Sequence, residues 1–230
     1  MNIPIDYKIG IGALVSVVLG WVLGQGATIV KDWRALRRLR HGLITELEDL
    51  REDLRRVTLF HMHQLQYFAH GRISFNTVTP ITHLFFQTYY KDIFARLNRA
   101  QRISYQHTHA AIDVVNARNE EMATYLDKLR DVMTGREPTA VEVNEWGARV
   151  QISYLAVRTA VWHVETHLQR QKNPVLDYLG PTHKHYAEFQ HGLRDEIIRH
   201  IEQGKTVKPE DLDRLDAAHF MSEDPNERTK

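Results

Sequence analysis

Apolar residues dominate the stretch from Ile9 to Val30, which contains no Asp, Glu, Lys or Arg. An α-helix rises about 1.5 Å per residue, so a stretch of this length crosses the roughly 30 Å hydrocarbon core of a bilayer with some tilt. No later part of the chain has this character. The pattern predicts a single transmembrane helix over residues 9–30, preceded by a short extracytoplasmic N-terminus of residues 1–8.

Beyond this stretch, apolar side chains recur every three or four residues, which is the spacing of one helix face. The first such face consists of Leu36, Leu39, Leu43, Leu47, Leu50, Leu54, Val57 and His61. Only Gly42 interrupts this pattern, so we expect the span and this face to form one continuous helix that runs to about His70. Gly71 is expected to end it, because helices commonly close on a glycine in the left-handed conformation.

Further helical patterns occupy residues 79–133, 139–171, 180–204 and 209–219. Thr79 followed by Pro80 is typical of a helix start, and a break in the first of these patterns is expected near Lys91. Thr139 and Glu142 have the spacing of a capping box, which opens the second pattern.

Together these patterns predict an all-α fold. The single N-terminal transmembrane helix is expected to continue into a cytoplasmic up-down helical bundle of about four long helices, which spans residues 31–219. Residues 220–230 are too polar to pack and are expected to form a disordered tail.

Basic residues are concentrated directly after the apolar stretch, at Lys31, Arg34, Arg37, Arg38 and Arg40. Lys and Arg beside a span stay in the cytoplasm, so we expect the N-terminus outside and the bundle inside, as in a single-pass protein of a bacterial inner membrane. Membrane lipid with anionic headgroups is the expected partner of this charge. The alternatives are a cleaved signal peptide, which carries its basic residues before the apolar run, and a buried helix of a soluble protein.

Small residues recur every fourth position within the predicted span, at Gly12, Ser16, Gly20 and Gly24. This spacing leaves a smooth strip on one helix face, where two backbones approach closely, and Gly20 with Gly24 forms a GxxxG motif. The other interpretation is that membrane helices simply tolerate glycine. We expect the strip to bind a second copy of the chain, which makes a homo-oligomer.

The amino-acid composition excludes several kinds of functional site. The 230 residues carry a formal net charge of +1 and include no Cys and 14 His. Without Cys there are no disulfides, thiol nucleophiles or Cys-bound zinc, and the near-zero charge does not indicate nucleic-acid binding. No Gly-rich phosphate loop, nucleophile elbow or Ser/Lys dyad is visible, so no cofactor is expected.

Three pairs have an Arg followed by a His after four intervening residues: Arg56 and His61, Arg102 and His107, Arg158 and His163. This spacing resembles the signature of HEPN-type ribonucleases, helical domains that bring an Arg and a His from two subunits around a scissile phosphate. The resemblance covers this short motif alone. It implies Arg102 and His107 as catalytic residues, because their surroundings are polar where a bundle core is apolar.

Two His on one helix face give a candidate metal site. His163 and His167 are four residues apart, so both imidazoles can reach one ion, with a third ligand from His183, His185 or His191. Among 14 His, such a pair also arises without a metal.

A polar stripe runs along the middle of the pattern at 79–133. Its members are Asn98, Arg102, Tyr105, His109, Asp113, Asn116 and Glu120. The simpler interpretation is a solvated helix face, and the functional one is a buried polar network or ligand groove, for which every group must find a partner.

We therefore expect a non-enzymatic, membrane-anchored scaffold, sensor or effector that acts as an oligomer, with a further protein partner possible. The alternatives are a HEPN-like ribonuclease and an oligomeric pore that permeabilises the membrane.

Overall fold

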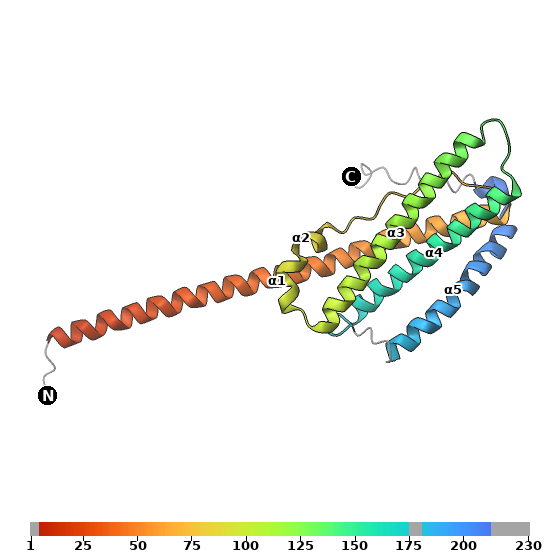
Figure 1. Ribbon diagram of the computed structural model, residues 1–230. Coiled ribbons are helices and arrows are strands. Elements are labelled where there is room, and N and C mark those ends of the chain that lie inside the picture. The colour runs from red at the N-terminus through yellow and green to blue at the C-terminus, as the bar shows by residue number, and fades with distance from the viewer. Residues whose placement is uncertain (1–4, 175–180, 213–230) are drawn as a thin grey trace.

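The computed structural model describes residues 5–174 and 181–212, with the side chains of 5–15, Val17, Pro181 and Thr182 excepted. The elements are α1 (Ile5–Ala69), α2 (Leu84–Ile93), the 3₁₀ turn η1 (Phe94–Arg96), α3 (Arg99–Val132), α4 (Ala140–Gln169) and α5 (Pro181–Thr206). No strand occurs in these ranges. The predicted all-α fold with four long helices in a bundle is confirmed (Figure 1).

Helix α1 is continuous over 65 residues, which corresponds to a length of about 100 Å. Its C-terminal half packs in the bundle, whereas its N-terminal half extends from one end of the bundle without a neighbouring element (Figure 1). Gly71 follows with a φ of 65°, a left-handed conformation that favours glycine. The predicted continuous helix and its glycine end are both confirmed.

The predicted transmembrane helix begins at Ile9, ahead of the first described side chain. In the part of the chain that the structure describes, no helix is both long and apolar enough to cross a membrane. Residues 213–219 of the predicted last helix and the predicted tail at 220–230 lie outside the described residues, and residues 209–212 are helical.

The helix predicted from Thr79 is wrong at its start, because residues 72–83 have no regular secondary structure and α2 begins only at Leu84. The side chain of Asn116 explains the difference: its Oδ1 accepts a hydrogen bond from the Ile81 N–H at 2.8 Å, and its amide donates to the Ile81 carbonyl at 2.8 Å. In a helix that starts at Thr79, the Ile81 carbonyl would accept from the Phe85 N–H. Here it accepts from Asn116, and the Phe85 N–H is bonded to Glu46. We call residues 70–83 the connector.

The connector changes the topology of the bundle. It returns the chain to the end where α2 lies, so that α1, α3 and α5 run in one direction and α4 in the other (Figure 1). The predicted up-down order therefore holds for α3, α4 and α5 but not for α1 and α3. The break near Lys91 lies slightly later, where Asn98 and Gln101 form a capping box that starts α3.

The core lies where α4 packs against both α1 and α3. One cluster of buried side chains joins the Leu residues of α1, among them Leu43, Leu47 and Leu54, to Ile112 and Val157. A second cluster at the other end of the bundle is built around the buried rings of Trp146 and Tyr154, and α5 completes it by contacting α1.

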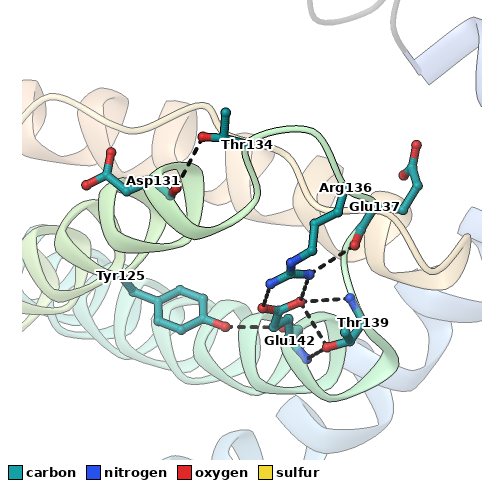
Figure 2. Close-up of polar contacts among 7 residues, drawn as sticks. All are labelled: Tyr125, Asp131, Thr134, Arg136, Glu137, Thr139 and Glu142. Atoms are coloured by element: carbon teal, nitrogen blue, oxygen red, sulfur yellow. Dashed lines mark hydrogen bonds and ion pairs between the residues drawn. The ribbon is translucent and has the colours of Figure 1, made fainter.

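The turn between α3 and α4 is fixed by the predicted capping box (Figure 2). Thr139 Oγ1 accepts from the Glu142 N–H at 3.3 Å, and Glu142 Oε2 accepts from the Thr139 N–H at 2.8 Å. Arg136 adds two hydrogen bonds to the Glu142 carboxylate, of 2.5 and 2.9 Å. Together with the Thr139 bonds, these lower the pKa of Glu142 to about 2, so this carboxylate stays ionised at neutral pH.

Helix α5 passes Gly204, which was expected to stop it, and ends at Thr206. Gly204 is instead a point of close contact, because a Cβ added there would lie 2.8 Å from the Cα of Gln66 in α1. The Gly204 carbonyl also accepts a hydrogen bond from His70 Nε2 at 2.9 Å.

We predict that Gly204→Ala lowers the free energy of unfolding by about 1–3 kcal/mol, because the added methyl group forces α5 away from the backbone of α1. Gly192→Ala in the same helix is the matched control. A Cβ at Gly192 meets nothing within 4 Å, so this change should raise stability by about 0.5–1 kcal/mol through helix propensity. Urea unfolding followed by circular dichroism measures both, and equal effects would contradict the close contact.

Candidate functional site

The polar stripe of α3 lies against the connector rather than facing solvent along its whole length. Asn116 holds Ile81, and Asp113 Oδ1 accepts a hydrogen bond from His83 Nε2 at 3.0 Å. His109 is buried, and its Nδ1 lies 3.2 Å from the Nδ1 of His83. Three neighbouring members of the stripe therefore fasten the connector to α3.

Glu46 of α1 extends this network to the start of α2. Its carboxylate accepts hydrogen bonds from the backbone N–H groups of Phe85 at 2.7 Å and Phe86 at 3.0 Å. The first N–H groups of a helix have no partner within the helix, and a carboxylate there also interacts favourably with the helix dipole. Glu46 Oε2 lies 3.8 Å from the Nε2 of His109. We call Glu46, His109, His83 and Asp113 the histidine chain.

Burial governs the electrostatics of the histidine chain. It raises the pKa of Glu46, and the two backbone hydrogen bonds from Phe86 and Phe85 oppose this shift. It lowers the pKa of His109 to about 3, helped by the nearby imidazoles of His83 and His167. Removal from water disfavours the charged form of both groups, so His109 is neutral at physiological pH.

A second polar group joins α1 to α3 further along. The buried imidazole of His61 contacts Gln64 Oε1 at 3.0 Å through Nδ1 and Asn119 Oδ1 at 3.1 Å through Nε2. Gln64 in turn donates to the carbonyl of Asn76 in the connector at 3.3 Å. Burial lowers the pKa of His61 to about 4.

The remaining members of the stripe have separate roles. Asn98 caps α3 and donates to the Lys172 carbonyl at the end of α4 at 2.8 Å. Tyr105 is buried, with its ring centroid 4.1 Å from that of His167, and Glu120 is exposed. The stripe is thus not one groove, and the binding role predicted for it stays a prediction.

Arg102 and His107 point to different neighbours. The Arg102 guanidinium donates to the Leu97 carbonyl at 2.6 Å and lies over the ring of Phe94, whereas the His107 ring stacks on His163 of α4 with centroids 5.8 Å apart. No hydrogen bond or ring contact joins Arg102 to His107 among the described residues. Their role as a ribonuclease pair stays a prediction.

His163 and His167 are both turned into the bundle. His167 is fully buried and its Nδ1 lies 2.9 Å from Ser104 Oγ; burial lowers the pKa of each imidazole to about 4. In the described ranges, no group of three or more His, Cys, Asp or Glu is arranged to hold a metal ion. The third ligand expected from His183, His185 or His191 is therefore missing there.

The most unusual surface is on the part of α1 outside the bundle, which we call the apolar segment, residues 16–30. Large apolar side chains are exposed along it, at Val18, Leu19, Trp21, Val22, Leu23, Ile29 and Val30. Trp21 and Leu23 are 66% and 71% exposed, and a Cβ added at Gly20 or Gly24 would meet nothing within 4 Å. Ser16 shares this segment, whereas Gly12 lies in helical backbone whose side chains are not described.

Sequence reasoning missed Glu46, His83 and Asn119. Glu46 had one signal, since it stands between Leu43 and Leu47 on the apolar face of its helix, where a carboxylate is out of place. His83 and Asn119 had none, because their partners are distant in sequence.

No known protein family, no curated protein and no solved structure matches the chain.

We predict that acid destabilises the bundle as soon as the pH falls below about 6.5. Neutral His61 and His167 are buried in the fold with pKa values of about 4, whereas an unfolded imidazole titrates near 6.5. Their stabilisation is complete above pH 6.5 and is lost as the pH falls toward 4, by about 2 kcal/mol for each at pH 5. Urea unfolding at pH 7 and pH 5 measures the loss.

His61→Gln should reduce the loss of unfolding free energy between pH 7 and pH 5 by the contribution of one imidazole. His191→Gln, at an exposed position of α5, should leave that loss unchanged. Equal acid sensitivity in all three proteins would show that buried imidazoles are not the cause.

Proposed function

We propose that this chain is a membrane-anchored helical-bundle protein that acts as a scaffold, sensor or effector by assembling with copies of itself. The observation that carries the proposal is the apolar segment, a helical stretch that leaves the bundle with large exposed apolar side chains and has no neighbouring element among the described residues (Figure 1). Exposed contiguous apolar surface of this kind marks a site that is covered by lipid or by another protein.

The residues that follow the apolar segment support a lipid environment. Lys31, Arg34, Arg37 and Arg38 follow it within about two turns, and the Arg37 guanidinium lies over the ring of the exposed Trp33. An aromatic ring beside several cations suits the headgroup layer of an anionic leaflet. The proposed orientation has the N-terminus outside and the bundle in the cytoplasm of a bacterial cell with an inner membrane.

The rotational phase of α1 supports self-association. At about 100° per residue, Gly20 and Gly24 face the same side as Asp49 and Asp53, each 29 residues later, to within about 20°. Asp49 is exposed, whereas Leu47, which is buried against the bundle, lies about 180° from Gly20. The small-residue strip thus faces away from the bundle, so a second α1 can approach it without a clash between the two bundles.

We predict that the detergent-solubilised chain is a defined oligomer by light scattering and that Gly20→Leu with Gly24→Leu reduces its mass at least twofold. The added side chains meet nothing within one chain, so the double variant should keep the fold and lose only the close approach of two helices.

Gly26→Leu is the matched control. Its Cβ also meets nothing, and its position lies about 200° around the helix from Gly24, on the other side of α1. This variant should keep the mass of the wild-type oligomer. A monomeric wild type, or the same mass in all three proteins, would contradict assembly through the small-residue strip.

The membrane anchor has its own test, because the chain contains no Cys. We predict that a membrane-impermeant maleimide labels Asn2→Cys in intact bacterial cells but labels Val132→Cys, which is 64% exposed on α3, only after lysis. Labelling of Val132→Cys in intact cells would reverse the proposed orientation. Recovery of the protein in the soluble fraction would remove the anchor.

A further inference from the structure

The histidine chain contains three successive contacts between four groups. Glu46 Oε2 faces His109 Nε2 at 3.8 Å, the two Nδ1 atoms of His109 and His83 face each other at 3.2 Å, and His83 Nε2 faces Asp113 Oδ1 at 3.0 Å. The last two distances are those of hydrogen bonds, and the first reaches one if it shortens by about 1 Å. His83 thus uses both of its nitrogens, whereas the Nε2 of His109 is buried without a hydrogen-bond partner and faces the Glu46 carboxylate.

Each of these contacts needs one hydrogen between its two atoms. Two neutral imidazoles carry two N–H groups in total, and two ionised carboxylates carry none. Two hydrogens fill the two contacts at hydrogen-bond distance, so with ordinary charges the lone pair of the buried His109 Nε2 faces a lone pair of Glu46 Oε2. One additional proton completes all three. A second additional proton gives both rings two N–H groups, and two hydrogens then meet between the Nδ1 atoms.

We propose that Glu46, His109, His83 and Asp113 form a buried proton-binding site, which holds one proton more than two neutral imidazoles and two carboxylates, and that this proton fastens the connector and the start of α2 to α1 and α3. The ligand of the site is the proton itself. Asp113 is exposed and is its point of exchange with solvent, whereas Glu46 and His109 are buried.

The extra proton has four arrangements that leave every contact filled, in which Glu46, His109, His83 or Asp113 carries it. When Glu46 carries it as a carboxylic acid, Glu46 donates to His109 Nε2 and His109 Nδ1–H donates to His83. When a ring carries it, that ring is an imidazolium ion and both carboxylates are ionised. Burial raises the pKa of Glu46 and lowers that of His109, which favours the first arrangement.

The groups around the site set the charge that it experiences. Those that face it are Asp49 of α1, Tyr105 of α3 and His167 of α4, whereas Tyr90 and Arg40 act on Tyr105. His167 is buried with a lowered pKa, and burial raises the pKa of both phenols, so these three groups add no charge near neutral pH. The extra proton is therefore held by the four members of the chain.

Losing the proton has a defined consequence for the fold. The contact left without a hydrogen loosens either the His83 end, which holds the connector, or the Glu46 end, which holds the Phe85 and Phe86 N–H groups of α2. The site thus links the protonation of one buried cluster to the docking of a segment that joins α1 to α3.

The test compares the pH dependence of unfolding in the full chain with that in Glu46→Gln. A glutamine amide donates to His109 Nε2 permanently and keeps an oxygen for the Phe86 N–H, so it imitates the proton-loaded site. In the wild type, the folded state binds one more proton than the unfolded state between pH 7.5 and 8.5. Its unfolding equilibrium constant should therefore rise with pH, by up to tenfold per pH unit. Glu46→Gln does not bind this proton, so the corresponding rise of its unfolding equilibrium constant should be absent.

Glu48→Gln is the matched control, because Glu48 is exposed on the same helix two residues away. It should keep the slope of the wild type. Equal slopes in wild type and Glu46→Gln would overturn the proposal.

A measurement on the wild type alone guards against a variant that fails to fold. Nitrogen NMR of the ¹⁵N-histidine-labelled chain at pH 7.5 distinguishes imidazole nitrogens that carry hydrogen from those that do not. The proposal requires three N–H groups among the four nitrogens of His83 and His109, or two with a protonated Glu46 or Asp113 seen by carboxyl ¹³C NMR. Two N–H groups with both Glu46 and Asp113 ionised would overturn it.

Discussion

The connector forms neither helix nor strand between α1 and α2, and this constraint shapes the polar interior of the bundle. Such a segment between two helices leaves its N–H and C=O groups unpaired unless side chains supply partners. Asn116 of α3 bonds to both the N–H and the carbonyl of Ile81, and Gln64 of α1 donates to the carbonyl of Asn76. Both helices thus provide hydrogen-bond partners for the connector. Polar side chains in these helices would otherwise be costly inside a core.

The same constraint explains why α1 and α3 run in one direction. A connector of this length returns the chain along the bundle, and α2 then begins against Glu46 and Gly42 of α1. The ring of Phe85 occupies the space that a Cβ at Gly42 would fill. The connector therefore takes the place of a helix. Side-chain hydrogen bonds from Asn116 and Gln64 hold it against the bundle, and the ring of Phe85 packs where it ends.

Features that depend on neighbours in sequence were predictable, and features that depend on distant partners were not. The capping box of Thr139 and Glu142 and the glycine end of α1 are local, so their spacing identified them. Thr79 with Pro80 gave an equally good local signal for a helix start, yet Asn116, 35 residues later, binds Ile81 and keeps the segment out of a helix. Glu46 and His83 acquire their roles in the same way, from groups 39 and 30 residues away. The four-helix bundle was predictable because apolar periodicity extends over whole helices.

The unbroken backbone of α1 makes the apolar segment and the bundle one mechanical part. Helix α1 contains no proline and no break from Ile5 to Ala69, so no joint lies between Val30 and the first buried leucine, Leu43. A rotation of the N-terminal half of α1 about the helix axis is therefore transmitted to the C-terminal half, which packs in the bundle. A tilt of the N-terminal half is transmitted in the same way. Any event that turns one N-terminal half against another moves the whole bundle by the same angle.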